Sequence, residues 1–237
     1  MDIGKVLARM MVIVADDEQF SRAIVLRMVR ELGAVDAEPV RNGEEGLVLL
    51  AQARDKAPLL IADFNMPRCN GLQMLKAIRA GRAFVANDMP VIMLTGYSDF
   101  ALVRVAMALD VDAFVVKPVS KATLSSRIEK ILGETRDIKP AEQYAEIDIE
   151  SVCNRMIRNE PLGRPLPPAP KKVASGAIQV KLEDVPEGVV LGDDIRTKDG
   201  ELLLAAGHTL NARFLRRLRE LKAVTKIEFL TILPPAK

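Results

Sequence analysis

The stretch Pro58-Leu59-Leu60-Ile61-Ala62-Asp63-Phe64-Asn65-Met66-Pro67 decides the fold of this chain. Its apolar run from Leu59 to Ala62 is short and flanked by prolines, which favours a buried parallel strand over a helix. The strand ends in one carboxylate, Asp63. Because ligands of open α/β sheets bind at the carboxyl ends of the strands, we expect a functional site here if other strands bring complementary groups to the same edge.

Composition limits the class of protein. The 237 residues exceed one average domain, and the 49% hydrophobic content supports a core. Lys and Arg total 34 against 32 Asp and Glu, so the charge of +2 requires neither a nucleic-acid nor a membrane partner. Cys69 and Cys153 lie far apart and outside metal-ligand spacing, which favours a reduced, cytoplasmic protein. No stretch approaches the roughly 18 apolar residues of a membrane helix, so we expect a soluble protein.

Strand and helix patterns alternate along residues 11–133. Short apolar runs predict strands at 11–15, 37–40, 59–62, 90–94 and 112–116, and apolar stripes at helical spacing follow each of them. Ser120 is expected to cap the last helix, and Gly133 to end it. Five strands alternating with five helices require parallel pairing and crossover connections, which predicts a doubly wound α/β sandwich.

The chain outside residues 11–133 differs in composition. Residues 1–10 form an N-terminal extension, and residues 134–177 hold six of the 14 prolines, which indicates a Pro-rich linker. A helix from Ala141 to Ile157 is expected to pack on one of the domains. Residues 178–237 predict a small β-rich module, with strands at 189–191, 202–204 and 226–230 and one helix capped by Asn211.

The strand ends carry a chemically coherent set of side chains. Asp16 and Asp17 follow the first strand, Asp63 ends the third, Thr95 the fourth and Lys117 the fifth. Carboxylates gathered at one edge repel each other unless a cation neutralises them, which indicates a hard divalent ion such as Mg²⁺. With an ammonium group and a hydroxyl beside them, they suit phosphoryl transfer to an aspartate. Phosphoester hydrolysis is less favoured, because the single histidine of the chain, His208, lies far outside this region.

These residues make the first domain resemble a receiver domain of two-component response regulators. The acidic pair, the segment from Asp63 to Pro67 with Gly71 beyond it, Thr95-Gly96 and Lys117-Pro118 occur in the order and at the spacings of that family. The resemblance covers residues 11–133 and implies the flavodoxin-like fold of receivers. It also implies a sensor histidine kinase or phosphotransfer protein as partner.

The resemblance assigns a role to each matched position. Asp63 is the expected phosphoacceptor, and Lys117 is expected to pair with it. The bond from Lys117 to Pro118 is expected to be cis. Mg²⁺ is expected to bind Asp63, Asp17, the backbone carbonyl of Asn65 and, mainly through water, Asp16.

Further positions are expected to switch or tune the site. Thr95 is expected to move to the phosphoryl group and Phe114, where many members have Tyr, to turn inward in response. Asn65 and Tyr97 occupy positions that tune hydrolysis in the family. A homodimer through the fourth and fifth helices of the receiver is a further expectation.

Structural alternatives exist for several of these residues. Asp16 and Asp17 could cap a helix, Lys117 could be a surface lysine with a buried stem, and Phe114 could be a core aromatic alone. The set of matched strand ends favours a role in the functional site, over these structural alternatives, for the acidic pair and Lys117. It leaves Phe114 evenly balanced between a switch and a core residue.

The C-terminal module offers weaker signals. Residues 185–207 resemble a small segment found beside HD-type phosphodiesterase domains, but the His and Asp metal ligands of that enzyme are absent, so we expect an interaction module and no separate enzyme. Its basic helix, 213–222, predicts a solvated face opposite Phe214 and Leu218. The alternatives are a DNA-binding transcriptional regulator acting through this helix, or an unphosphorylated receiver that serves as a scaffold. The output partner is left open.

Overall fold

The computed structural model describes residues 2–53, 56–96, 100–136, 138–150, 153, 177–196 and 202–233. Tyr97, the proline-rich run 165–170 and most of the expected linker lie outside these residues. The chain divides into two compact units. Met1–Gly96 and Ala108–Ile149 form the first, and Tyr97–Met107 groups with Glu150–Lys237 in the second.

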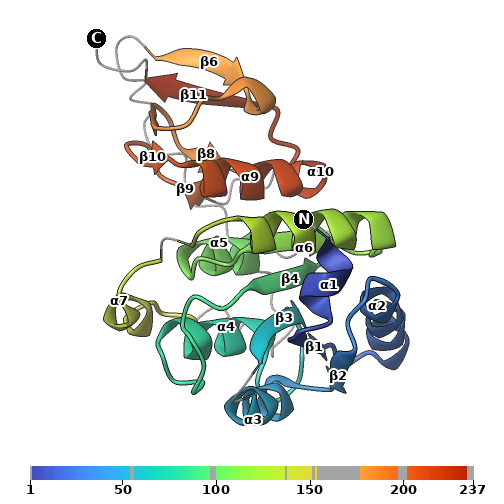
Figure 1. Ribbon diagram of the computed structural model, residues 1–237. Coiled ribbons are helices and arrows are strands. Elements are labelled where there is room, and N and C mark those ends of the chain that lie inside the picture. Colours follow the sequence, from blue (N-terminus) through green and yellow to red (C-terminus); the bar gives the residue numbers. More distant parts are fainter. Residues whose placement is uncertain are drawn as a thin grey trace. The chain divides into compact units, whose positions relative to one another are not determined.

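A five-stranded parallel sheet organises the first unit (Figure 1). Its strands are β1 (Met10–Ala15), β2 (Asp36–Val40), β3 (Ala57–Asp63), β4 (Val91–Thr95) and β5 (Ala113–Val116). The spatial order β2-β1-β3-β4-β5 reverses direction between β1 and β3, and such a switch point opens a crevice at the carboxyl edge. Ala15 pairs with Ala62, so Asp16 and Asp63 leave neighbouring strands at the same edge. The predicted doubly wound parallel sheet is confirmed.

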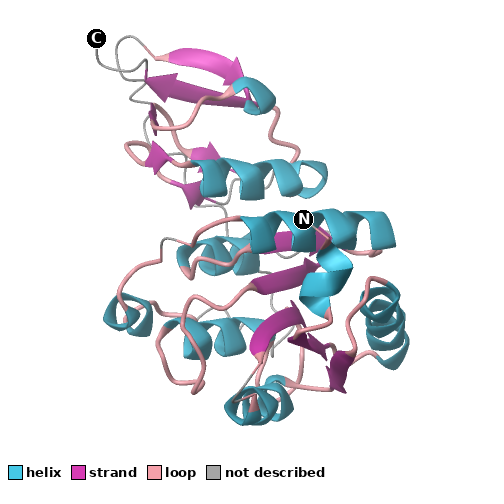
Figure 2. Ribbon diagram, viewed as in Figure 1, coloured by secondary structure: helices cyan, strands magenta, loops and turns pink. Residues whose placement is uncertain are grey.

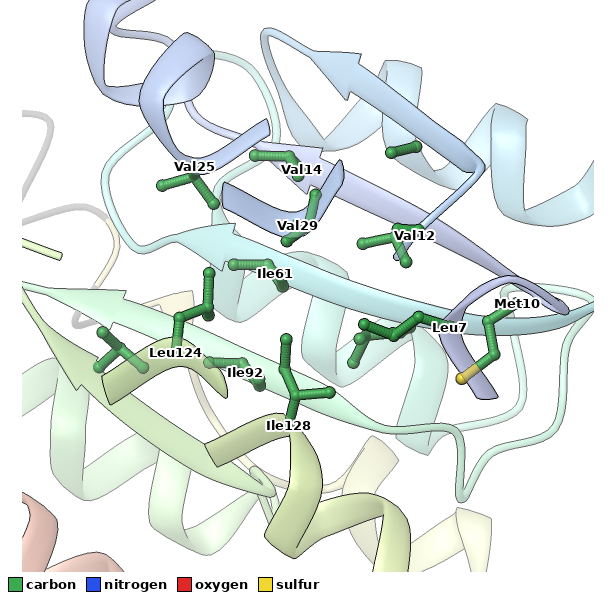
Figure 3. Close-up of a cluster of buried hydrophobic side chains, with 14 of the residues drawn as sticks. Leu7, Met10, Val12, Val14, Val25, Val29, Ile61, Ile92, Leu124 and Ile128 are labelled. Atoms are coloured by element: carbon green, nitrogen blue, oxygen red, sulfur yellow. The ribbon is translucent and has the colours of Figure 1, made fainter. Parts of the chain in front are cut away.

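Helices join the strands and cover the sheet. They are α1 (Ile3–Leu7), α2 (Gln19–Glu31), α3 (Gly43–Gln52), α4 (Gly71–Arg79) and α6 (Lys121–Gly133). The helix α5 (Phe100–Ala108) follows β4 along the chain, and all of it except Ala108 groups with the second unit. Side chains from α1, α2 and α6 share one buried cluster with alternate residues of the strands, and Figure 3 shows Leu7, Val29 and Ile128 within it. Helices α3 and α4 pack against each other elsewhere, with Met74 close to Gly46.

Side-chain caps fix where the helices of the first unit begin. The Glu18 carboxylate accepts from the first amides of α2, Asn70 forms a capping box with Gln73 at α4, and the Ser120 hydroxyl accepts from the Thr123 amide at α6. These caps satisfy amides that have no partner inside the helix. Because α2 and α4 start just after β1 and β3, the caps also hold the loops at the carboxyl edge.

The amino edge of the same sheet holds a buried ionic cluster, which we name the Arg79 cluster after its central residue. The Arg79 guanidinium is fully buried and donates to the Asp112 carboxylate at 2.7 Å. Its other bonds reach the carbonyl oxygens of Asn87, Met89 and Asp110 at 2.6–3.3 Å. Arg136 donates from Nε to the other Asp112 oxygen at 3.1 Å. The cluster therefore joins the end of α4, the approach to β4, the turn before β5 and the chain after α6.

Residues 134–136 and 138–149, which we call the strap, continue past α6 along this edge. The strap contains α7 (Ala141–Ala145), whose Tyr144 is buried. The Tyr144 hydroxyl donates to Asp110 Oδ2 at 2.9 Å and accepts from the Lys139 amide at 2.7 Å. Lys76 donates to the Ile147 carbonyl at 2.7 Å. The helix expected from Ala141 is thus a short one that packs on α4, and residues 151–152 and 154–157 are outside the described part.

The second unit contains the β-rich module (Figure 2). Its strands and helices are β6 (Ile178–Lys181), a 3-10 turn η1 (Leu182–Asp184), β7 (Val189–Leu191), β8 (Ile195–Arg196), β9 (Leu202–Leu204), β10 (Thr209–Leu210), α9 (Ala212–Glu220), α10 (Lys222–Thr225) and β11 (Phe229–Leu233). The sheet order β10-β7-β11-β6 is antiparallel, and β8 pairs with β9. The expected strand at 226–230 lies later, because Lys226 ends α10 in a left-handed conformation.

The basic helix of this module differs from the expected solvated face. Asn211 caps α9 as predicted, but Arg216 and Arg217 are buried, and Arg216 lies 3.6 Å from Glu220. Arg219 donates to three carbonyl oxygens in and after η1, at 3.1–3.2 Å. The expectation of a solvated face was therefore wrong for Arg216 and Arg217, which are buried, whereas Arg219 is exposed as expected.

Candidate functional site

Three carboxylates meet at the carboxyl edge of the parallel sheet. Asp16 and Asp17 follow β1 and Asp63 ends β3, and one oxygen of each lies within 4.8 Å of those of the others. Asp16 and Asp63 are buried, whereas Asp17 is exposed. Closely spaced carboxylate oxygens form the donor set that a hard divalent cation prefers, so these residues fit Mg²⁺. The exposed position of Asp17 leaves one side of the group open to solvent.

Lys117 brings the opposing charge from the end of β5. Its ammonium nitrogen lies 2.8 Å from Asp63 Oδ1 and 3.0 Å from Asp16 Oδ2. The bond from Lys117 to Pro118 is cis, as the family resemblance led us to expect. The predicted strand-end residues Asp16, Asp63 and Lys117 are thus in direct contact.

Burial and charge act in opposite directions on this pair. Burial, with a smaller contribution from the Asp16 charge, raises the pKa of the Asp63 carboxyl above its ordinary value, although Lys117 and the Asn65 amide oppose the shift. Burial alone would lower the pKa of Lys117, but Asp63 and Asp16 raise it above the ordinary lysine value. Lys117 is therefore held as a cation, and the cluster retains an excess of carboxylates.

The other predicted site residues surround this pair. Thr95 is fully buried at the end of β4, and its hydroxyl donates to the Gly96 carbonyl at 3.1 Å. Asn65 is exposed, and its backbone N–H donates to Asp63 Oδ2 at 3.2 Å. A Cβ at Gly71 would overlap the Asp63 carbonyl oxygen, so glycine lets α4 start close to the phosphoacceptor candidate.

Phe114 points into the protein. It is 1% exposed and its ring stacks on that of Phe64, with centroids 6.2 Å apart. The inward position that the family resemblance assigned to a response is therefore already present in this structure. The switch role of Phe114 stays a prediction, as does the metal role of the Asn65 carbonyl.

Two residues beside the acidic pair were not anticipated. The Ser21 hydroxyl donates to Asp16 Oδ2 at 2.6 Å, and Arg22 Nη1 donates to the carbonyl oxygens of Asp16 and Asp17 at 2.6 and 3.2 Å. Both stand on the first turn of α2. A usable sequence signal existed, since a serine and an arginine that follow an acidic loop on the first helical turn can reach back to it.

The fold and this site define a doubly wound protein with an acidic, lysine-paired pocket at its switch point, and comparison with known proteins agrees. A family model described as "Response regulator receiver domain" matches residues 12–129. "Chemotaxis protein CheY homolog" of Campylobacter jejuni (strain 81-176) is 35% identical over 124 residues, which cover 52% of this chain and 93% of that protein. "Chemotaxis protein CheY1" of Helicobacter pylori (strain J99) is 33% identical over 124 residues, covering 52% and 98%.

A structure of chemotaxis protein CheY4 of Vibrio cholerae aligns with a TM-score of 0.46 at 26% identity, covering 52% of this chain and 99% of that one. The chain belongs to the response regulator receiver family.

The receiver match ends at residue 129 and does not reach the C-terminal module. The resemblance of residues 185–207 to a segment beside HD-type phosphodiesterases therefore stays a prediction. Among the described residues, no helix combines the length and apolar character needed to cross a membrane.

Proposed function

We propose that this protein is a response regulator in a phosphorelay and that Asp63 accepts the phosphoryl group. The observation that carries the proposal is the contact of Asp63 with Lys117 at 2.8 Å, beside two further carboxylates at a switch point. Receiver domains receive phosphoryl groups from histidine kinases or phosphotransfer proteins, and we assign that class of donor to this chain.

The proposed reaction moves a phosphoryl group from a phosphohistidine to Asp63. An Asp63 carboxylate oxygen forms the new P–O bond while the P–N bond of the donor breaks, and the imidazole nitrogen keeps the electron pair and takes a proton from solvent. Lys117 stays protonated and turns its charge to the phosphoryl oxygens as the charge of Asp63 is taken up by the new bond. The Thr95 hydroxyl donates to an oxygen of the transferred group.

The acidic residues are proposed to hold Mg²⁺. Asp17 is the exposed carboxylate and can bind directly, whereas Asp16 already accepts bonds on both oxygens from protein donors and binds mainly through water. The bound ion would neutralise charge on the carboxylates and on the incoming phosphoryl group. Asn65 and Tyr97 are proposed to control access of water and so the lifetime of the phosphoryl group.

Incubation with acetyl phosphate and Mg²⁺ tests the assignment. We expect intact-mass analysis to show one added phosphoryl group on the wild type and none on Asp63→Asn. Asp193→Asn, in the other unit, is the matched control and should be modified like the wild type. Unmodified wild type that still binds Mg²⁺ would instead support an unphosphorylated scaffold.

An exposed apolar pair beside the site supports docking of the phosphodonor protein. Phe20 and Ile24 lie one turn apart on α2, with exposed fractions of 78% and 53%, just after the acidic loop. We propose that a donor protein contacts Phe20 and Ile24 as it reaches Asp63, whereas a small phosphodonor does not. We expect Phe20→Ala to slow transfer from the cognate kinase without slowing modification by acetyl phosphate. Equal slowing with both donors would place Phe20 in the site itself and remove the docking role.

The C-terminal module is proposed to pass the signal on by protein contacts. Arg219 is engaged with backbone carbonyl oxygens, and Arg216 and Arg217 are buried, which leaves α9 poorly suited to contact DNA phosphates.

Phosphorylation is proposed to act through Thr95 and Phe114 on the fourth and fifth helices of the receiver, here α5 and α6, and a homodimer through them is one outcome. Sedimentation experiments test the dimer: the phosphorylated protein is expected to have a higher mass in solution than the unphosphorylated protein.

A further inference from the structure

The loop that carries the acidic pair is held by two side chains of α2. Ser21 donates to the Asp16 carboxylate at 2.6 Å, while the Glu18 amide donates to its other oxygen at 2.9 Å. Arg22 bonds the backbone of the loop instead, reaching the carbonyl oxygens of Asp16 and Asp17 at 2.6 and 3.2 Å. The two side chains therefore fix different parts of the loop, one the carboxylate and the other the main chain.

The loop requires such support because its charges oppose the arrangement. Asp16, Asp17 and Asp63 approach one another closely, and carboxylates without a cation drive each other apart. A backbone that could move would turn Asp17, which is exposed, away from Asp63. Arg22 joins two successive carbonyl oxygens of the loop, which restricts the direction in which Asp17 projects. Ser21 fixes the Asp16 oxygen that also accepts from Lys117.

We propose that Ser21 and Arg22 are positioning residues that hold Asp16 and Asp17 in the arrangement that binds Mg²⁺. The inference rests on the proposed function. Neither residue is a metal ligand: Arg22 cannot be one because it is a cation, and the Ser21 hydroxyl is directed at Asp16. Their contribution is preorganisation, since outer partners of metal ligands commonly change metal affinity by about 10- to 100-fold.

Charge and position predict opposite effects at Arg22. The guanidinium is positive and lies beside a cation site, so by charge alone its removal should strengthen Mg²⁺ binding. If Arg22 acts by holding the loop, its removal should weaken Mg²⁺ binding instead. The direction of the change therefore separates a positioning role from a simple electrostatic one.

Calorimetric titration of the full chain with MgCl₂, without any phosphodonor, is the test. We expect Ser21→Ala and Arg22→Met each to raise the Kd of Mg²⁺ about 10-fold. Ser21→Thr keeps a hydroxyl at the same position and should restore binding. Arg27→Met is the matched control, because Arg27 lies on the same helix and loses the same charge but pairs with Glu31, away from the loop. Urea unfolding of each metal-free variant reports whether it is folded.

Each result has one meaning. Weaker Mg²⁺ binding in Ser21→Ala and Arg22→Met, with Ser21→Thr and Arg27→Met close to the wild type, supports the inference. A residue whose replacement leaves the Kd unchanged or lowers it has no positioning role. If Arg22→Met is unfolded, the comparison of Ser21→Ala with Ser21→Thr decides whether the positioning role holds. A wild type that binds no Mg²⁺ would contradict the proposed function itself, which distinguishes that failure from failure of the positioning role alone.

Discussion

At the carboxyl edge of the parallel sheet, three carboxylates lie close together and two of them, Asp16 and Asp63, pair with the ammonium group of Lys117. At the amino edge, in contrast, the Asp112 carboxylate lies between two guanidinium groups. The first cluster has an excess of negative charge and one exposed member, Asp17. In the Arg79 cluster the central guanidinium is wholly buried and its donors are spread over a carboxylate and three carbonyl oxygens.

The difference separates function from structure within one sheet. A buried charge whose hydrogen bonds are satisfied holds segments together and has nothing left to offer a ligand. A cluster with unbalanced charge is costly to the fold and keeps its affinity for a cation or a phosphoryl group. The two edges should therefore respond to substitution in opposite directions.

The largest expected effect is at the amino edge. Arg79→Met leaves Asp112 and several carbonyl oxygens without their main donor, and we expect the free energy of unfolding to fall by about 3–5 kcal/mol. Urea denaturation followed by circular dichroism measures this. Arg82→Met, three residues on and exposed, should stay within about 0.5 kcal/mol of the wild type. A small loss in Arg79→Met would show that the cluster is not a structural centre.

A smaller loss is expected where the strap joins the same carboxylate. Arg136→Met removes the bond to Asp112 and one to the Ile131 carbonyl, while Arg79 still neutralises Asp112. We expect a fall of about 1.5–3 kcal/mol in the free energy of unfolding, the range for hydrogen bonds to charged groups. Lys130→Met, on the exposed side of α6, serves as the control. A loss equal to that of Arg79→Met would mean that the cluster breaks as one unit.

At the carboxyl edge, we expect a substitution to raise the free energy of unfolding instead of lowering it. Because burial raises the pKa of Asp63, its ionised form is unfavourable in the folded protein, and the neutral side chain of Asp63→Asn avoids that cost. We expect a higher urea midpoint than in the wild type when Mg²⁺ is removed with EDTA. Asp17→Asn should change the midpoint less, since Asp17 is exposed. A lower midpoint in Asp63→Asn would mean that its pairing with Lys117 outweighs burial.

The smallest effect at neutral pH concerns Tyr144 in the strap. Burial, together with the Asp110 charge, raises the pKa of Tyr144 to about 12. Since an unfolded tyrosine titrates near 10, the stabilisation is complete below about pH 10 and is lost as the pH rises toward 12. The chain has two tyrosines and no tryptophan, so tyrosinate absorbance of Tyr97→Phe reports Tyr144 alone. A midpoint near 10 would indicate a strap that is open to solvent.

The sequence predicted the carboxyl edge well because its signals are local. Short apolar runs bounded by polar residues located the five strands, and parallel pairing then required Asp16, Asp63 and Lys117 to converge. Caps such as Ser120 and Asn211 were also found, since a capping residue acts within a few positions of itself.

The amino edge could not be predicted in the same way. Arg79 is one residue past Ile78 on α4, and its acceptors come from residues 87, 89, 110 and 112, which are joined only by the tertiary fold. The buried arginines of α9 were missed for a related reason, because a basic helix with an apolar stripe was expected to expose its charges. Ser21 and Arg22 were within reach of a local argument.

The strap has a consequence for how this receiver can be recombined with other output domains. A chimera joined directly after Gly133 would discard Arg136, one of the two arginines that bond Asp112, and Tyr144, which bonds Asp110. A junction after Ile149 would carry these residues along. The unit that can be exchanged between proteins is therefore expected to be longer than the 12–129 segment that the receiver family has in common with this chain.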